Sequence, residues 1–181
     1  MAGPWHKPNL AAAQRIGLFT GGIIGGVLLS GLAGVRLNPS PSIPVGFYLI
    51  TSAADAPLVE FCPSAGVGQL SRSRGYRACG PCPDGAAPLV KPVVGREGDL
   101  IDFSTRGIAV NGRLLPNTVA LPQDTAGRPL PHWPFGRYQV AHGTAWMASS
   151  HNPLSFDSRY FGPVELRTIQ HRLRPLWTFG N

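Results

Sequence analysis

The pattern of apolar and polar positions divides the chain into one long uncharged run and a series of short apolar segments. The long run covers residues 16–35, about twenty residues without a charge. A transmembrane helix needs about 20 predominantly apolar residues to cross the bilayer core. The run therefore predicts a single membrane anchor, and the short segments after it predict a mainly β domain.

Within that domain, strand-like runs alternate with turns, as the 23 glycines and 19 prolines suggest. The predicted strands are residues 47–51, 88–94, 100–104, 108–110, 137–140 and 165–174. Asn111-Gly112 predicts a tight hairpin turn. Residues 67–74 are the best candidate for a helix, and the segment 116–135, with five prolines, predicts an exposed excursion rather than core.

The anchor sets the predicted domain organisation. We expect a cytoplasmic tail at residues 1–15, the transmembrane anchor at 16–35 and a periplasmic domain at 36–181. This orientation rests on a slight excess of positive charge before the run, where Lys7 and Arg15 face only Arg36 after it. A cleaved signal peptide is the alternative, but its apolar core is normally shorter.

The net charge of +7 comes mainly from arginines spread through the domain. Attraction to anionic lipid headgroups is the simplest use of that charge. A nucleic-acid partner is not expected, because no binding motif and no dense basic stripe with interleaved aromatic residues is present.

Lys91 is one of only two lysines among 16 basic residues, and the other, Lys7, precedes the predicted anchor. Lys91 lies in an apolar run that, read as a strand, places Leu89, Lys91 and Val93 on one face. Burial would lower the pKa of the amine, and a neutral amine at physiological pH is a general base. The alternative is a lysine whose head group lies in water.

Ser42 follows the predicted anchor closely, in a stretch stiffened by Pro39, Pro41 and Pro44. From Val35 the chain reaches at most roughly 23 Å to Ser42, so this hydroxyl would act near a bilayer surface. By itself, a Pro/Ser stretch after an anchor is typical of a linker.

Three separated blocks resemble the membrane-bound signal peptidases that use a serine and lysine dyad, and within them the conjugative transfer branch, the TraF peptidases. The blocks are Asn38-x-Ser40-x-Ser42-x-Pro44-x-Gly46, Lys91-x-Val93-Val94-Gly95-x-x-Gly98-Asp99 and Ser155-Phe156-Asp157-Ser158-Arg159-Tyr160-Phe161-Gly162. Ser42-Ile43-Pro44 is one residue shorter than the matching spacing in ordinary bacterial signal peptidases, which favours the TraF branch.

The resemblance implies a role for each matching residue. Ser42 matches the acylated nucleophile and Lys91 the base that takes its proton. Ser40 matches a hydroxyl that stabilises the oxyanion beside the Ser42 amide, and Ser155 matches a hydroxyl that orients the lysine. The remaining pair, Asp157 and Arg159, matches a supporting ion pair behind the site. A more direct role for Asp157 and a simple surface salt bridge are the alternatives.

The resemblance also implies the substrate, a conjugative pilin precursor with a hydrophobic segment, whose acyl-enzyme water or the pilin's own amino terminus would resolve. A general signal peptidase and a non-catalytic component of a conjugation channel are the alternatives. Pro92 departs from the family pattern, because the wider family often has a basic residue there. The proline removes one ladder donor, which predicts an edge position for that strand.

The three cysteines include a thioredoxin-like tetrapeptide from Cys79 to Cys82. The turn signal that follows it and the absence of a βαβ pattern argue against redox catalysis. Pairing of Cys62 with Cys79 or Cys82 would instead close a loop of about twenty residues. The five histidines show no metal-ligand spacing, so neither a metal nor a cofactor is expected.

Overall fold

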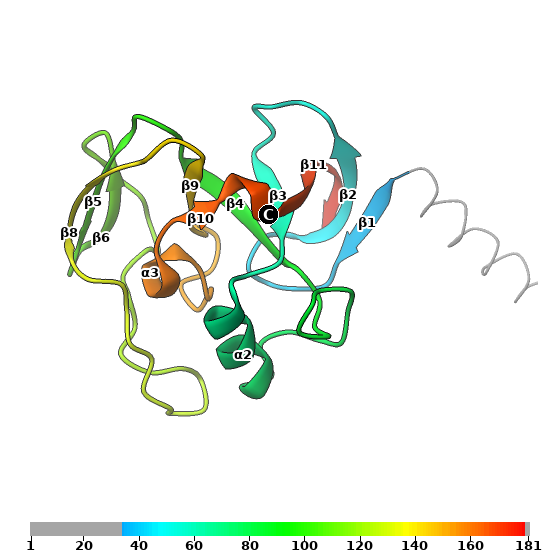
Figure 1. Ribbon diagram of the computed structural model, residues 1–181, viewed down its shortest axis with the longest axis horizontal. Helices are drawn as coiled ribbons and strands as arrows, with labels where there is room; N and C mark the ends of the chain where they lie inside the picture. The colour runs from blue at the N-terminus through cyan, green and yellow to red at the C-terminus, as the bar shows by residue number, and fades with distance from the viewer. Residues whose placement is uncertain (1–33, 180–181) are drawn as a thin grey trace, which may run out of the picture. The chain divides into compact units, whose positions relative to one another are not determined.

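The computed structural model describes residues 34–179 of the chain (Figure 1). The predicted cytoplasmic tail and the predicted anchor lie outside these residues, except for Gly34 and Val35. Val35 begins strand β1 (Val35–Asn38) rather than continuing a helix. Within residues 34–179, no helix is long and apolar enough to cross a membrane, so the anchor stays a prediction.

Two β-sheets make up the domain that follows. The larger sheet has the strand order β1-β2-β11-β3-β4-β9-β10, and the smaller has the order β7-β6-β5-β8. The other large-sheet strands are β2 (Val45–Thr51), β3 (Leu58–Phe61), β4 (Leu89–Gly95), β9 (Thr144–Met147), β10 (Val164–Glu165) and β11 (Ile169–Phe179). The small sheet contains β5 (Leu100–Ser104), β6 (Gly107–Val110), β7 (Arg113–Leu114) and β8 (Gly136–Gln139). The predicted mainly β class agrees with this architecture.

Helical segments are few in residues 34–179. They are α2 (Ala65–Ser73), the single turn α3 (Ser158–Phe161) and the 3₁₀ turn η1 (Leu166–Thr168). The helix predicted at 67–74 is therefore confirmed, with a start two residues earlier. The strand predicted at 165–174 is wrong in its first half, because η1 interrupts it, and β11 continues instead to Phe179.

Three apolar clusters form the core of the domain, and one of them joins the two sheets. The first packs the small sheet against the large one, with Ile101 and Phe103 of β5 against Trp146 of β9. The second lies among β3, β4 and β9. The third joins Ile43, next to Ser42, to Tyr48 of β2 and to residues of β3 and β11. The segment that contains Ser42 is thus attached to the core through Ile43.

The predicted hairpin is confirmed, since Val110 pairs with Arg113 across a two-residue turn. Asn111 has φ 49° and Gly112 has φ 82°, the left-handed values that this turn requires. The predicted exposed excursion is wrong at two of its positions. Thr118 and Leu130 are buried there, and the Thr118 hydroxyl hydrogen-bonds the backbone of Ile108.

The edge position predicted for the strand with Pro92 is also wrong. In the large sheet β4 lies between β3 and β9. The pairing of β4 with β9 begins at Val93, and the Pro92 carbonyl accepts a hydrogen bond from the Ala148 N–H. The missing donor therefore falls where the β4–β9 ladder starts, and an interior strand tolerates it.

Candidate active site

Ser42 lies in the turn between β1 and β2, and its neighbours fix the shape of that turn. The Asn38 side-chain amide donates to the carbonyl of Ser40 at 2.8 Å and to that of Pro44 at 3.3 Å. Asn38 also accepts from the Ser40 N–H, and Ile43 is buried in the core. The turn is therefore fixed at several points, which a free linker would not be.

Lys91 lies in the middle of β4, with its amine directed at two hydroxyls. Its Nζ is 2.7 Å from Ser42 Oγ and 2.9 Å from Ser155 Oγ. The side chain is only 3% exposed, so the alternative of a head group in water is wrong. Leu89, two residues earlier on the predicted common face, is buried as well.

Burial lowers the pKa of Lys91 from 10.5 to about 8. Desolvation is the main cause, because a charged amine is poorly stabilised away from water. The nearby Asp157 carboxylate opposes this change and the Arg159 guanidinium adds to it. A substantial fraction of the amine is consequently neutral near physiological pH, as a general base must be.

The two groups expected to stabilise an oxyanion lie next to each other. The Ser42 N–H donates to Ser40 Oγ at 3.3 Å, and Ser40 is exposed. In this arrangement the Ser40 hydroxyl accepts the hydrogen bond that the Ser42 N–H would donate to a substrate oxygen. An oxyanion placed there would accept from both groups.

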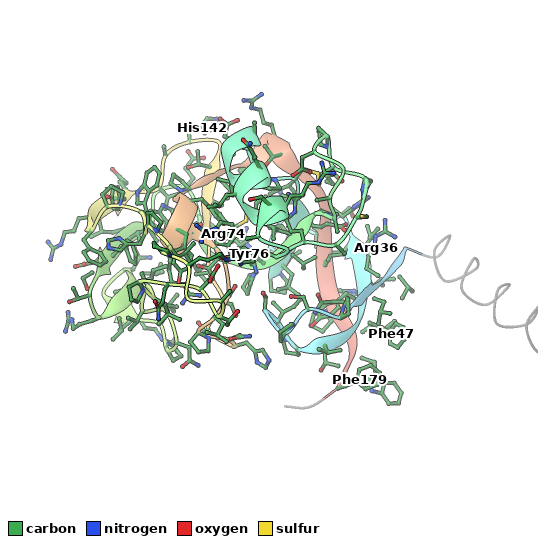
Figure 2. All side chains as sticks on the ribbon, turned by 90° about the horizontal axis from the view of Figure 1, so that it is seen from below. Arg36, Phe47, Arg74, Tyr76, His142 and Phe179 are labelled. Atoms are coloured by element: carbon green, nitrogen blue, oxygen red, sulfur yellow. A yellow bond between two sulfur atoms is a disulfide. The ribbon has the colours of Figure 1, made fainter. Side chains whose placement is uncertain are left out.

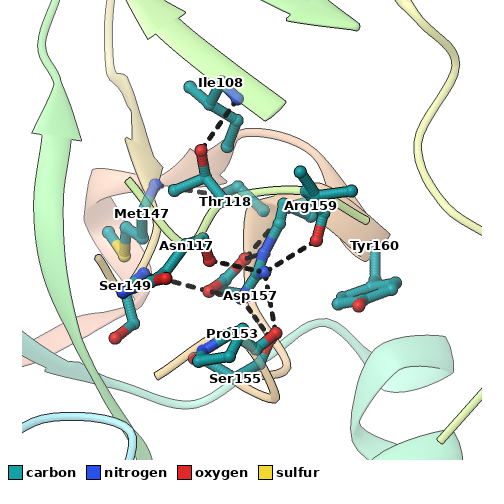
Figure 3. A network of polar contacts seen from close by, with 12 residues as sticks. Ile108, Asn117, Thr118, Met147, Ser149, Pro153, Ser155, Asp157, Arg159 and Tyr160 are labelled. Atoms are coloured by element: carbon teal, nitrogen blue, oxygen red, sulfur yellow. Dashed lines mark hydrogen bonds and ion pairs between the residues drawn. The ribbon is translucent and has the colours of Figure 1, made fainter. Parts of the chain in front are cut away.

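Asp157 and Arg159 form a buried ion pair next to Ser155 (Figure 3). Arg159 Nε lies 2.8 Å from Asp157 Oδ1, and Nη2 lies 2.9 Å from Oδ2. Both side chains are fully buried, so the surface salt bridge alternative is wrong. The guanidinium also donates to the backbone carbonyls of Asn117, Val119 and Pro153.

Ser155 connects the ion pair to Lys91. Arg159 Nη2 donates to the Ser155 carbonyl at 2.8 Å, and the hydroxyl of Ser155 contacts Lys91. The hydrogen bonds of the Asp157 carboxylate go to Arg159 and to the Ser149 N–H, and none joins it to Ser42 or Lys91. This geometry favours support over direct chemistry for Asp157.

Sequence reasoning missed two residues of the site, Ser149 and Asn152. The Ser149 hydroxyl donates to the carbonyl of Ser42, and the Asn152 amide donates to that of Pro41 at 3.3 Å. Neither residue belongs to the three blocks that suggested the family. The one signal in the sequence is that both residues lie within six positions before Ser155, where the third block begins.

A cleft of about 480 Å³ lies beside the dyad. Its lining includes Ser42, Lys91 and apolar or aromatic side chains, namely Leu89, Val90, Leu121, Leu130, Phe156 and Tyr160. The segment predicted as an excursion thus supplies one wall. A larger hollow, about 910 Å³, lies by Cys62 and Arg167 and contains none of the predicted site residues.

The cysteines form a disulfide between Cys62 and Cys82, and Cys79 is free and exposed. The structure therefore selects one of the two predicted pairings, and the thioredoxin-like tetrapeptide is not itself bridged. Among residues 34–179, no group of three or more histidine, cysteine or acidic side chains is placed to hold a metal ion.

Removing this disulfide should destabilise the domain without reaching the chemistry. We expect Cys62→Ser to lower the free energy of unfolding by about 3 kcal/mol, because the bridge closes a loop of 20 residues. Cys79→Ser, which removes only the exposed free thiol, should have little effect and is the matched control. Denaturant unfolding of the two variants tests this, and equal stabilities would contradict it.

Comparison with known proteins gives the family. The sequence profile described as "Signal peptidase, peptidase S26" matches residues 12–177. The chain belongs to the S26 signal peptidase family. Among curated proteins, a plasmid transfer protein TraF of Escherichia coli is 38% identical over 159 residues, covering 84% of this chain and 90% of its own length. A probable conjugal transfer protein TraF of Sinorhizobium fredii is 31% identical, covering 87% of this chain and 84% of its own length.

Among solved structures, a signal peptidase I from Enterococcus faecalis V583 is 17% identical to this chain. The match covers 69% of this chain and 99% of that chain, with a TM-score of 0.37. A score of this size supports no conclusion about the site.

Proposed function

We propose that this protein is a membrane-anchored serine endopeptidase that uses Ser42 and Lys91 as a dyad to mature a conjugative pilin precursor. The observation that carries the proposal is the 2.7 Å distance between Ser42 Oγ and the Nζ of a buried lysine. A buried amine of lowered pKa beside a hydroxyl is the arrangement that activates a serine without a histidine.

The proposed reaction begins with neutral Lys91 accepting the Ser42 hydroxyl proton. Ser42 Oγ attacks the scissile carbonyl, and the oxyanion accepts hydrogen bonds from the Ser42 N–H and the Ser40 hydroxyl. The ammonium of Lys91 then protonates the departing amine, and the C–N bond breaks. Lys91, neutral again, takes a proton from water, which attacks the acyl ester. The ester C–O bond then breaks, and the Lys91 ammonium returns the proton to Ser42 Oγ.

Membership of the S26 family supports peptidase chemistry, and the relatives named for plasmid or conjugal transfer support the pathway. The proposed substrate is accordingly an exported precursor with a hydrophobic segment. A general signal peptidase or a non-catalytic channel component would behave differently in cells, as the test below specifies.

Two features support a periplasmic domain at the inner membrane. Disulfides such as Cys62–Cys82 persist in oxidising compartments. Exposed aromatic side chains from β2 and β11 also gather together: Phe47 and Phe179 lie side by side in Figure 2, and Trp177, 68% exposed, pairs with Phe47 across the strands. Aromatic rings of this kind suit a membrane interface.

Pilin maturation in cells tests the proposal. We expect the precursor to accumulate when either Ser42→Ala or Lys91→Arg replaces the wild-type protein at normal membrane levels, because arginine stays protonated and cannot act as a base. Bulk secretion should continue, which separates a transfer-specific enzyme from a general signal peptidase. Mature pilin in both variants would show a non-catalytic component.

The same cells report the fate of the acyl-enzyme. Capture by water gives linear pilin, whereas capture by the pilin's own amino terminus gives a cyclic product lighter by one water. Intact mass of mature pilin distinguishes them, and a linear mass alone would exclude cyclisation.

A further inference from the structure

Both peptide groups that flank Ser42 are held by side chains from a distant segment, residues 149–152. The Ser149 hydroxyl donates to the Ser42 carbonyl, across 107 positions of sequence. The Asn152 amide donates to the Pro41 carbonyl at 3.3 Å. These contacts involve the backbone of the nucleophile, not its hydroxyl.

The contact with Pro41 determines where the Ser42 N–H points. No cis peptide bond occurs in residues 34–179, so the Pro41 carbonyl and the Ser42 N–H point in opposite directions from one planar peptide group. When Asn152 holds that carbonyl, it also aims the N–H away from itself, at Ser40 Oγ. The N–H is the donor assigned above to the oxyanion.

Ser149 is itself rigidly placed. It is fully buried, and its N–H donates to Asp157 Oδ2 at 3.0 Å (Figure 3). Its hydroxyl accepts from the N–H groups of His151 and Asn152, each at 3.1 Å, which leaves the hydroxyl proton for the Ser42 carbonyl. The buried ion pair therefore supports the nucleophile through Ser149, separately from its support of Lys91 through Ser155.

We propose that Ser149 and Asn152 are positioning residues that orient the two peptide groups around Ser42, so that its amide faces the oxyanion while its hydroxyl faces Lys91. This inference rests on the peptidase function proposed above. A donor group prearranged at the oxyanion stabilises the transition state more than the bound substrate, so its loss lowers kcat rather than raising KM.

The test measures steady-state cleavage of a precursor-derived peptide by full-length protein in detergent. We expect Ser149→Ala and Asn152→Ala each to lower kcat by about tenfold, with KM changed less than about threefold. Ser150→Ala is the matched control, since the structure shows no hydrogen bond from that hydroxyl, and it should keep wild-type kcat. The alkaline rise of activity near pH 8 should stay in place in all three variants, because Lys91 keeps its surroundings.

A kcat for Asn152→Ala within twofold of wild type would overturn the proposal for Asn152, and the same result for Ser149→Ala would overturn it for Ser149. A displaced pH profile would also overturn it, since the residues would then act through Lys91. Thermal unfolding shows whether the Ser149→Ala protein is folded. If it is not, the kcat of Asn152→Ala, at a partly exposed position, decides whether the proposal stands. If wild type and Ser42→Ala are equally inactive, the proposed peptidase function fails instead.

Discussion

Lys91→Met should abolish cleavage, lowering kcat by about 10⁴-fold or more, because it removes the proposed base and leaves the rest of the site in place. In the wild-type enzyme kcat/KM should rise about tenfold per pH unit up to about pH 8 and then level off. The sign follows from the lowered pKa of Lys91, since only the neutral amine accepts the serine proton. Peptide cleavage followed from pH 6 to pH 10 measures both effects.

The stability of the same variant provides the control for folding. The fall in the Lys91 pKa from 10.5 to about 8 corresponds to a cost on the order of 3 kcal/mol. This cost is fully present below pH 8, because the unfolded chain binds the proton more tightly, and it disappears as the pH rises past 10.5. The stability of Lys91→Met relative to wild type should therefore fall between pH 8 and pH 10.5.

A flat pH–rate profile in the wild type would contradict the assignment of Lys91 as base. A stability difference independent of pH would show that the amine is not buried as the structure places it. If Lys91→Met cleaved the peptide within tenfold of the wild-type rate, a group other than Lys91 would be the base.

Asp157→Asn should lower the free energy of unfolding by about 3–5 kcal/mol, because it leaves the buried Arg159 charge without its partner. That is a large share of the 5–15 kcal/mol that stabilises a typical domain. Activity should fall as well, since Arg159 holds the Ser155 carbonyl and Ser155 contacts Lys91. Denaturant unfolding and peptide cleavage are the two measurements.

Asp102→Asn is the matched control for this substitution. Asp102 pairs with Arg137 at 3.4 Å, but both side chains are exposed, and exposed pairs contribute little to stability. If the two variants lost the same free energy of unfolding, burial would not be the reason that the Asp157–Arg159 pair stabilises the domain.

Several strands could be predicted from local signals alone. The run with Lys91, the run at 100–104 and the hairpin at Asn111-Gly112 each combine apolar alternation with strong turn residues. The signals failed for β3 and β9, because these short strands are buried at three of their four positions and show no apolar–polar alternation. They also failed at Thr118, whose burial depends on a hydrogen bond to the distant Ile108.

The candidate site was only partly accessible from sequence. The scarcity of lysine and the three blocks indicated Ser42, Lys91 and Ser155, and the structure brings these three side chains together. Ser149 and Asn152 carried no such signal, because hydroxyl and amide side chains before a loop are common. Their importance depends on which carbonyls they face, and those belong to residues more than 100 positions away.

The sequence by itself determined the family and indicated the chemistry proposed here, because an unusual lysine and three motifs are properties of local residue order. Only the tertiary structure decided that Lys91 is desolvated, that Asp157 and Arg159 are buried, and that Cys62 pairs with Cys82. Burial, pKa and pairing all depend on which segments meet in space. Contacts between distant segments result from packing across the whole domain, and a local pattern along the chain does not specify them.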